Sequence, residues 1–107
     1  LIEDRVTGNS RGMLVSGAKV LIDRRKPDGN RVKSFTIGGK PIDPKKIYRL
    51  AVSDYLAEGN SGFDRLTQVA PEHIIFTGTL LRQTMIDYVR KHAQITSTLD
   101  GRWKEIK

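Results

Sequence analysis

The 107-residue sequence predicts an α+β fold in which one long helix packs on a mostly antiparallel sheet that contains a β-hairpin. Two observations support this prediction. Apolar and polar residues alternate in several short segments, which is the period of a half-buried strand. Residues 79–92 instead repeat their apolar residues with the period of one helix face.

The hairpin is predicted from two strand-like segments, residues 13–23 and residues 31–37. Between them, Pro27-Asp28-Gly29 is typical of a turn, because proline presets φ and glycine accepts a positive φ. The residues that share a strand face are Ala18, Val20 and Ile22 in the first segment, and Phe35 and Ile37 in the second. The tip of this hairpin is basic.

Residues 38–46 are predicted to form a loop, since a Gly38-Gly39 pair and two prolines disfavour both helix and ladder. Residues 47–53 then alternate like a third strand. Residues 54–59 predict one helical turn that ends at Gly59, a residue favoured just beyond helix ends.

The helix over residues 79–92 is predicted to begin with Thr79 as its N-cap. Three basic or titratable residues occupy its last turn, where positive charge suits the helix dipole. Its apolar face comprises Leu81, Met85, Tyr88, Val89 and His92. Residues 100–107 predict a turn and a short closing strand.

The net charge of +7 is local, because residues 19–49 hold ten Lys/Arg against three Asp/Glu. Such a patch suits a nucleic-acid surface or a solvated hairpin with protected edges, and the second interpretation is favoured because aromatics are not interleaved with the charges. The sequence has no cysteine, no apolar run long enough to span a membrane, and no signal-peptide pattern in its first residues.

No catalytic set and no metal site is predicted. His73 and His92 lie nineteen residues apart without metal-ligand spacing, so His73 is interpreted as a loop residue and His92 as a packing or capping residue. The sequence also lacks a G-x-S-x-G elbow and a P-loop.

The segment Ala-Glu-Gly-Asn-Ser-Gly-Phe, residues 57–63, uses two glycines and two small polar residues to present one aromatic ring. Glycines permit tight turns and close approach by a ligand. Phe63 is therefore either a core residue that closes the loop or a ring held against a flat ligand.

The order of the motifs resembles the C-terminal domain of the 5′-nucleotidase family, over about residues 12–106. The matching pieces, in chain order, are Val15-Ser16-Gly17, Gly39-Lys40-Pro41-Ile42-Asp43-Pro44, Tyr48, Asp54-Tyr55-Leu56-Ala57, Gly59, Gly62-Phe63, Asp87-Tyr88 and Gly101-Arg102. Two departures accompany them. The family's Gly-Gly-Asp-Gly reads here as residues 59–62, Gly-Asn-Ser-Gly, and Met13 stands where the family's second stacking aromatic is expected.

The resemblance implies a single domain, residues 1–107, that forms the latter part of a nucleotide-binding C-terminal domain. It implies that Phe63 stacks on the base and that the substrate-binding residues are Phe63, Gly59, Asn60, Ser61, Gly62 and Asp64. Hydrolysis of a nucleoside 5′-phosphate would occur in a separate N-terminal metallophosphatase domain with two divalent metal ions, and this chain would hold no cofactor.

The same resemblance implies a periplasmic, cell-surface or extracellular location, with a nucleotide or nucleoside and the N-terminal domain as partners, and neither nucleic acid nor a membrane. The alternatives are a non-catalytic binding or structural module that kept the fold, and a basic nucleic-acid-binding domain.

Overall fold

The computed structural model describes residues 1–10 and 12–107. They divide into two compact units. Unit 1 comprises Leu1–Ala51 and Leu99–Lys107, and unit 2 comprises Val52–Thr98. Unit 1 contains the sheet and unit 2 contains both α-helices, so the predicted α+β class is confirmed.

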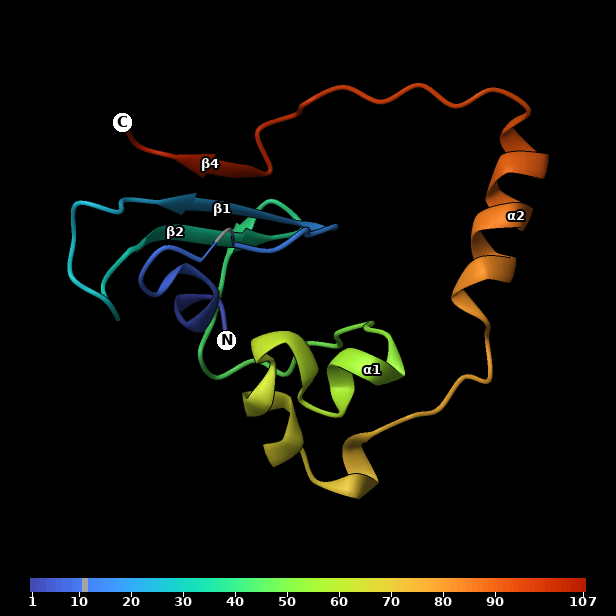
Figure 1. Cartoon of the computed structure of the whole chain (residues 1–107), viewed down its shortest axis with the longest axis horizontal. Helices are drawn as coiled ribbons and strands as arrows, with labels where there is room; N and C mark the ends of the chain where they lie inside the picture. Colours follow the sequence, from blue (N-terminus) through green and yellow to red (C-terminus); the bar gives the residue numbers. More distant parts are fainter. Residues whose placement is uncertain (11) are drawn as a thin grey trace. The chain divides into compact units, whose positions relative to one another are not determined.

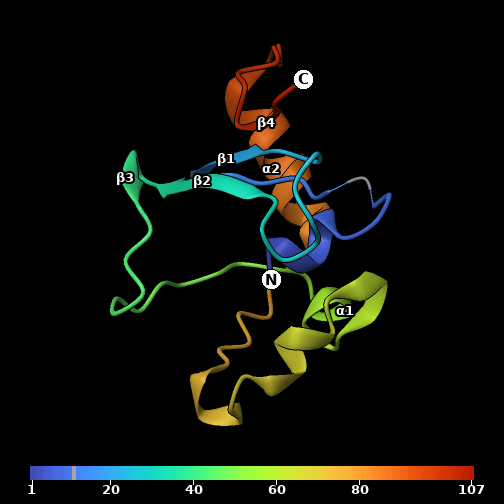
Figure 2. The same ribbon diagram turned by 90° about the vertical axis from the view of Figure 1, so that its left-hand side faces the viewer.

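The sheet of unit 1 has four strands in the order β3-β2-β1-β4 (Figures 1 and 2). The strands are β1 (Ala18–Ile22), β2 (Val32–Ile37), β3 (Lys40–Pro41) and β4 (Trp103–Glu105). β1 and β2 form the predicted antiparallel hairpin, and β3 pairs antiparallel with β2. β4 pairs parallel with β1, so the sheet is mixed rather than mostly antiparallel. Residues 23–102 separate β1 from β4, and so long a connection permits a parallel pairing that a tight turn forbids.

The core of unit 1 lies on one face of this sheet. Val20 and Ile22 are fully buried there, as the alternation in the sequence predicts, and Val6 from the 3₁₀ helix η1 (Glu3–Val6) joins them. The partly buried side chains packed around this cluster are Ile2, Val32, Phe35 and Trp103. A β-bulge between Leu21 and Ile22 interrupts the β1–β2 ladder.

Two sequence predictions fail between residues 38 and 53. The ladder continues at β3, although residues 38–46 were predicted as loop, because Pro41 lies on an edge strand where its missing N–H removes no ladder bond. Residues 47–53 form no strand in the described structure, although their alternation is strand-like. Alternation therefore indicates a strand face but does not supply the neighbour that a ladder requires.

Unit 2 begins with the short helix α1 (Asp54–Ala57), which Ser53 caps by accepting a hydrogen bond from the Leu56 amide at 3.4 Å. The 3₁₀ helices η2 (Asn60–Gly62), η3 (Asp64–Gln68) and η4 (Pro71–His73) follow, and His73 therefore ends a short turn. The predicted helical turn that stops at Gly59 is confirmed.

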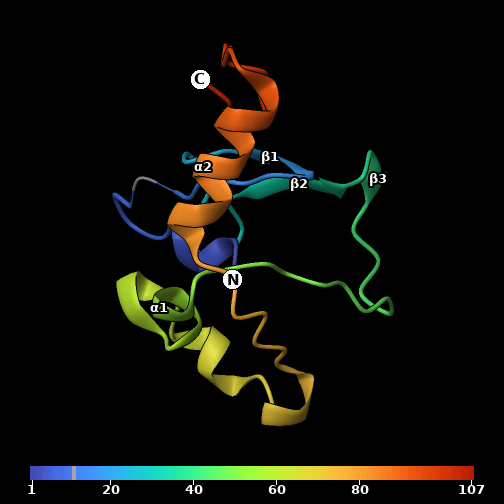
Figure 3. The ribbon, with the colours of Figure 1, turned by 90° about the vertical axis from the view of Figure 1, so that its right-hand side faces the viewer.

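The long helix α2 (Leu81–His92) ends at the residue that the sequence predicts (Figure 3). Its N-cap is Leu80, which offers no side-chain hydrogen bond, so the prediction of Thr79 as N-cap is wrong. The Thr79 amide instead donates to Thr77 Oγ1 at 3.2 Å. The predicted apolar face of α2 remains largely exposed. Within the described residues, no helix combines the length and apolar character needed to cross a membrane.

Candidate functional site

The candidate binding loop, residues 59–64, begins where α1 ends. The Gly59 amide donates to the Leu56 carbonyl at 3.0 Å, and Gly59 itself adopts φ +91°, in the left-handed region. A Cβ at Gly59 would stand 2.7 Å from Thr67 Cγ2 and 3.4 Å from the Asp64 Cα. Position 59 therefore requires glycine both for its backbone conformation and for its lack of a side chain.

Two more residues of the loop have positive φ. Gly62 has φ +80°, and Ser61 has φ +55° and ψ +32°, a conformation that residues with a Cβ adopt at an energetic cost. Asn60 stabilises the turn, because its Nδ2 donates to the Tyr55 carbonyl at 2.8 Å. Strained backbone of this kind concentrates at ligand-binding and catalytic positions.

Phe63 lies at the end of the turn and is only 6% exposed. Its amide donates to the Asn60 carbonyl at 3.2 Å, and its carbonyl accepts from the Leu66 amide at 2.9 Å, which joins the loop to η3. The burial of its side chain agrees with the interpretation of Phe63 as a residue of the hydrophobic core. Stacking on a nucleobase additionally requires that one face of the ring be uncovered when the ligand binds.

The remaining predicted site residues form the outer surface of the loop. Ser61, Gly62 and Asp64 are exposed, whereas Gly59 and Asn60 are half-buried. Thr67 Oγ1 donates to the Asp64 backbone carbonyl at 2.6 Å, and Asp64 as a whole is exposed. The structure therefore brings all six predicted residues into one short turn, with a polar exterior and a buried ring.

Tyr55, an exposed aromatic, was not singled out by the sequence analysis as a site residue. It lies on α1, and its carbonyl is the acceptor for the Asn60 side chain. The available signal was its position in the Asp-Tyr-Leu-Ala motif, immediately before the glycine turn.

The arginines of the basic segment are largely engaged inside unit 1. Arg31 Nη1 donates to the Val6 and Gly8 carbonyls at 2.6 and 2.7 Å, and Arg24 donates to the Ser10 carbonyl at 2.5 Å. These bonds tie the N-terminal segment to the hairpin. The interpretation of the hairpin as merely solvated charge therefore fails for Arg24 and Arg31, while the lysines between residues 19 and 46 are exposed.

Asp23 is the one buried charged residue in the described part of the chain. Arg25 donates to both of its carboxylate oxygens at 2.8 Å, and these hydrogen bonds lower the pKa of Asp23 to about 2 against the opposing effect of burial. Asp100 has a similar bidentate partner in Arg102, whose hydrogen bonds lower the Asp100 pKa to about 2. Both pairs order turns beside the sheet.

Neither histidine is placed for metal binding. His92 stacks on Tyr88 with ring centroids 4.0 Å apart, and its Nδ1 lies 2.9 Å from the Tyr88 carbonyl, which fits the predicted packing or capping role. Among the described residues, no group of three or more His, Cys, Asp or Glu side chains is arranged to hold a metal ion.

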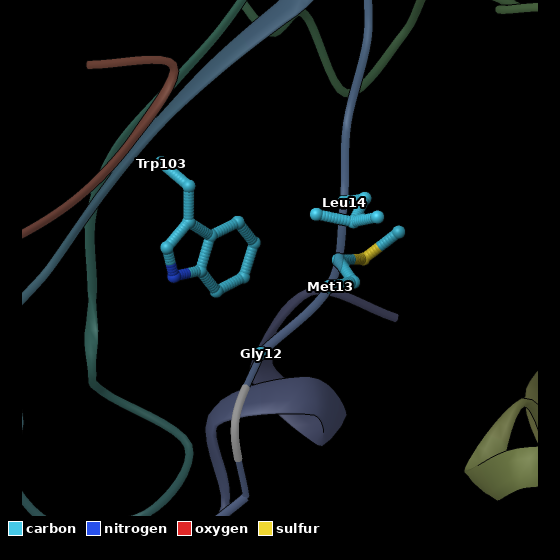
Figure 4. A pocket seen from close by; sticks show the side chains of 4 residues that line it. All are labelled: Gly12, Met13, Leu14 and Trp103. Atoms are coloured by element: carbon cyan, nitrogen blue, oxygen red, sulfur yellow. The ribbon is translucent and has the colours of Figure 1, made fainter. Parts of the chain in front are cut away.

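Unit 1 contains an open hollow of about 320 Å³ between Trp103 and residues 12–14 (Figure 4). Met13, which stands where the family's second stacking aromatic is expected, lines this hollow with Gly12 and Leu14. Gly12 is buried against the indole, and a Cβ at Gly12 would lie 2.5 Å from Trp103 Cζ2.

Residues 2–68 match the family model described as 5′-nucleotidase, C-terminal domain. This match covers more than half of the chain and includes the whole of the candidate loop. The chain belongs to this family. The 5′-nucleotidase resemblance of the sequence is therefore confirmed, and the match ends at Gln68, the last residue of η3.

Curated relatives agree with this assignment to the 5′-nucleotidase family. The chain is 32% identical over 71 residues to Protein UshA of Yersinia enterocolitica, with 66% of the chain covered. It is 29% identical to an apyrase of Tabanus yao over 99% of the chain, and 27% identical to a snake venom 5′-nucleotidase of Crotalus adamanteus over 82%. The chain spans 12%, 20% and 16% of the lengths of these three proteins.

Proposed function

We propose that this chain is the substrate-recognition part of a two-domain 5′-nucleotidase-type phosphohydrolase. The observation that carries the proposal is the family match over residues 2–68, which includes the glycine turn of residues 59–64. The left-handed backbone conformation of Ser61 supports it, because a loop held in a strained shape is preorganised for a ligand.

In this proposal the reaction is hydrolysis of a nucleoside 5′-phosphate to a nucleoside and phosphate. The attacking water and the scissile P–O bond lie in an N-terminal metallophosphatase domain that uses two divalent metal ions. The residues described here contain no metal-ligand cluster, so no metal-dependent step is assigned to them. Their contribution is to bind and orient the nucleoside. Holding the substrate in position lowers the activation barrier to hydrolysis.

Within the loop, we assign the ring of Phe63 to the face of the base. Gly59 and Gly62 shape the turn beneath it, and the polar groups of Asn60, Ser61 and Asp64 supply hydrogen-bonding capacity toward the nucleoside. An Asp64 carboxylate accepts hydrogen bonds, so it suits a ribose hydroxyl or a base amino group. The family's Gly-Gly-Asp-Gly has an aspartate where this chain has Ser61. Because serine has no carboxylate, this loop has one carboxylate acceptor fewer than the family motif.

The proposal extends to the whole protein. Residues 1–107 form one domain, the latter part of the C-terminal domain, and work with the N-terminal domain of the same protein in the periplasm, at the cell surface or outside the cell. The ligands are nucleotides or nucleosides, with neither nucleic acid nor a membrane as partner.

Isotope-edited NMR tests the binding role directly on the 107-residue chain and on the longer protein. We expect AMP to shift the amides of residues 59–64, while Gly38 in the β2–β3 turn serves as an internal control. We also expect the chain alone to release no phosphate from AMP with any divalent metal.

The alternatives predict different results. A structural module leaves residues 59–64 unshifted by millimolar AMP in the longer protein. A nucleic-acid-binding domain instead retains DNA or RNA at about 200 mM salt, where non-specific phosphate contacts are strongly weakened.

A further inference from the structure

Thr67 lies against the point where the two ends of the candidate binding loop meet. A Cβ at Gly59 would stand 3.4 Å from the Asp64 Cα, so the first and last residues of the loop lie next to each other. The same Cβ would stand 2.7 Å from Thr67 Cγ2. The Thr67 methyl therefore fills the space that a side chain at position 59 would need.

The hydroxyl of Thr67 bonds to the other end of the loop. Its Oγ1 donates to the Asp64 backbone carbonyl at 2.6 Å. Because the hydroxyl and the methyl branch from the same Cβ, a bond that fixes one branch also fixes the direction of the other. The one side chain thus contacts both ends of the loop, Gly59 through its methyl and Asp64 through its hydroxyl.

The loop requires contacts of this kind because its own backbone does not favour the closed shape. Ser61 adopts φ +55°, a conformation that costs free energy for a residue with a Cβ and persists only where the surrounding structure over-determines it. The flanking helices α1 and η3 have four and five residues, too few to be stable alone. Asn60 Nδ2 ties the loop to the Tyr55 carbonyl of α1 at 2.8 Å, and Thr67 ties it to η3.

We propose that Thr67 is a positioning residue of the candidate binding loop. Its two branches hold residues 59–64 closed and so fix the ring of Phe63 at the end of the turn. The consequence for binding rests on the proposed recognition of a nucleoside by this loop. Thr67 acts through Gly59 and Asp64 without touching the ligand, and it lies within the family match over residues 2–68.

A purely local role for Thr67 predicts something different. Serine and threonine hydroxyls often bond to a carbonyl three or four residues earlier in the chain. Such a bond needs only the hydroxyl, so serine would replace threonine at position 67 without loss. The methyl contact with Gly59 is the part that joins η3 to the start of the loop, and it makes threonine specifically necessary.

Three substitutions separate the two branches. Thr67→Ser keeps the hydroxyl and removes the methyl, Thr67→Val keeps a methyl and loses the hydroxyl, and Thr67→Ala removes both. Thr84 in α2 is the matched control, because its Oγ1 also donates to a backbone carbonyl, that of Leu80, at 3.2 Å. Thr84→Ala therefore removes a similar local bond outside the loop.

Amide hydrogen exchange of the 107-residue chain measures how often the turn opens. The reporter is the Phe63 amide, which donates to the Asn60 carbonyl at 3.2 Å. We expect its exchange to accelerate about two- to tenfold in Thr67→Val, from the lost hydrogen bond. In Thr67→Ser the lost methyl contact should accelerate it about two- to fourfold.

Thr67→Ala should accelerate exchange of the Phe63 amide more than either single-branch variant, and Thr84→Ala should leave it unchanged. An unchanged rate in Thr67→Ser or in Thr67→Val would show that one branch does not hold the loop, which overturns the proposal. Equal acceleration in Thr84→Ala and Thr67→Ala overturns it as well.

Gly59→Ala tests the methyl contact directly. Its new Cβ would stand 2.7 Å from Thr67 Cγ2, in addition to the backbone strain of φ +91° at position 59. In the Thr67→Ser background Cγ2 is absent and the backbone strain remains. Gly59→Ala should therefore accelerate Phe63 exchange at least about twofold less in that background, a coupling typical of residues in contact. Equal acceleration in both backgrounds contradicts the contact and overturns the proposal.

Kinetics of the longer protein test the link to binding. Thr67→Ala should raise KM for AMP about two- to tenfold and change kcat by less than about twofold, since a base remote from the scissile phosphate is bound similarly in the ground and transition states. An unchanged KM in Thr67→Ala, with a raised KM in Phe63→Ala, overturns the proposal. If Phe63→Ala also leaves KM unchanged, the proposed nucleoside site fails, and the exchange rates decide separately whether Thr67 closes the turn.

Discussion

Among its described residues, unit 1 has three fully buried apolar side chains, Val6, Val20 and Ile22, whereas the buried apolar residue of unit 2 is Phe63. The core of unit 1 is supported by a four-stranded sheet that residues distant in sequence complete. Unit 2 is held mainly by local bonds within short helices and turns. Binding loops are commonly drawn from such less stable regions, and the candidate loop lies in unit 2.

The two units also differ in charge. Unit 1 has fifteen Lys/Arg against seven Asp/Glu, a net charge of +8, and unit 2 has four against five, a net charge of −1. In unit 1, Arg24 and Arg31 bind backbone carbonyls. The basic excess of this chain is therefore partly structural, while the candidate ligand-binding loop carries little net charge.

Truncation of the unit 1 core should have the largest effect. Ile22→Ala removes a fully buried side chain, so we expect the free energy of unfolding to fall by about 2–5 kcal/mol. Met85→Ala on the exposed face of α2 is the control and should change it by about 0.5 kcal/mol or less. Urea unfolding measures both, and similar losses for the two variants would show that unit 1 does not carry the main core.

The contact between Gly12 and Trp103 should be the next most sensitive position. Gly12→Ala places a Cβ 2.5 Å from Trp103 Cζ2 at φ +83°, and we expect a loss of roughly 1–3 kcal/mol. Gly17→Ala has a comparable φ of +71° but open space around its Cβ, so it isolates the backbone strain. If thermal unfolding finds equal losses for both, the indole contact contributes nothing.

The stability of unit 1 should depend on pH through the Asp23–Arg25 pair. Hydrogen bonds from Arg25 lower the pKa of Asp23 from 3.8 to about 2 in the folded state. The folded state therefore binds this proton less readily than the unfolded state, and the resulting stabilisation is present above about pH 4 and lost as the pH falls toward 2. We expect Asp23→Asn to flatten this part of the Tm profile, and an Asp23 carboxyl that titrates near 4 by NMR would contradict the assignment.

The smallest effect is expected in the loop of unit 2. Ser61→Gly relieves the left-handed conformation at φ +55°, so the free energy of unfolding should rise by up to about 1 kcal/mol. Ser61→Ala keeps a Cβ and should give no such gain. Chemical denaturation compares the two, and equal stabilities would show that position 61 is not strained in solution.

Local sequence determined most of the elements but not their partners. The hairpin, the turn ending at Gly59, the end of α2 and the closing strand were all predictable, because periodicity and turn residues act within a few positions. The direction of β4 and the absence of a strand at residues 47–53 were not predictable, since both depend on residues far away in the sequence. Leu80, rather than Thr79, is the N-cap, because the Thr84 amide donates to the Leu80 carbonyl at 3.0 Å and the helical hydrogen bonds therefore begin at Leu80.

The candidate site shows the same division. Two glycines separated by small polar residues predicted a tight turn at residues 59–62, and the positive φ values there confirm that turn. The burial of Phe63 could not be predicted, because one aromatic after a glycine turn is compatible with both a core and a ligand-facing ring. The role of Phe63 in binding stays a prediction.

Nucleotide kinetics of Phe63 variants test whether the ring of Phe63 stacks on the base of the substrate. In the longer protein, Phe63→Ala should raise KM for AMP by about ten- to a hundredfold, because stacking on a base contributes roughly 1–3 kcal/mol. The loss should appear mainly in KM, since a base remote from the scissile phosphate is bound similarly in the ground and transition states. Phe63→Tyr keeps the ring face and should be nearly silent.

Gly62→Val should be worse than either variant, because valine adopts the φ of +80° at position 62 only at high cost. Each variant is first checked for folding by thermal unfolding. We expect Phe63→Ala to fold and to show a raised KM for AMP. A Phe63→Ala protein that loses stability while its folded fraction retains the original KM would show that Phe63 is a core residue and does not stack on the base.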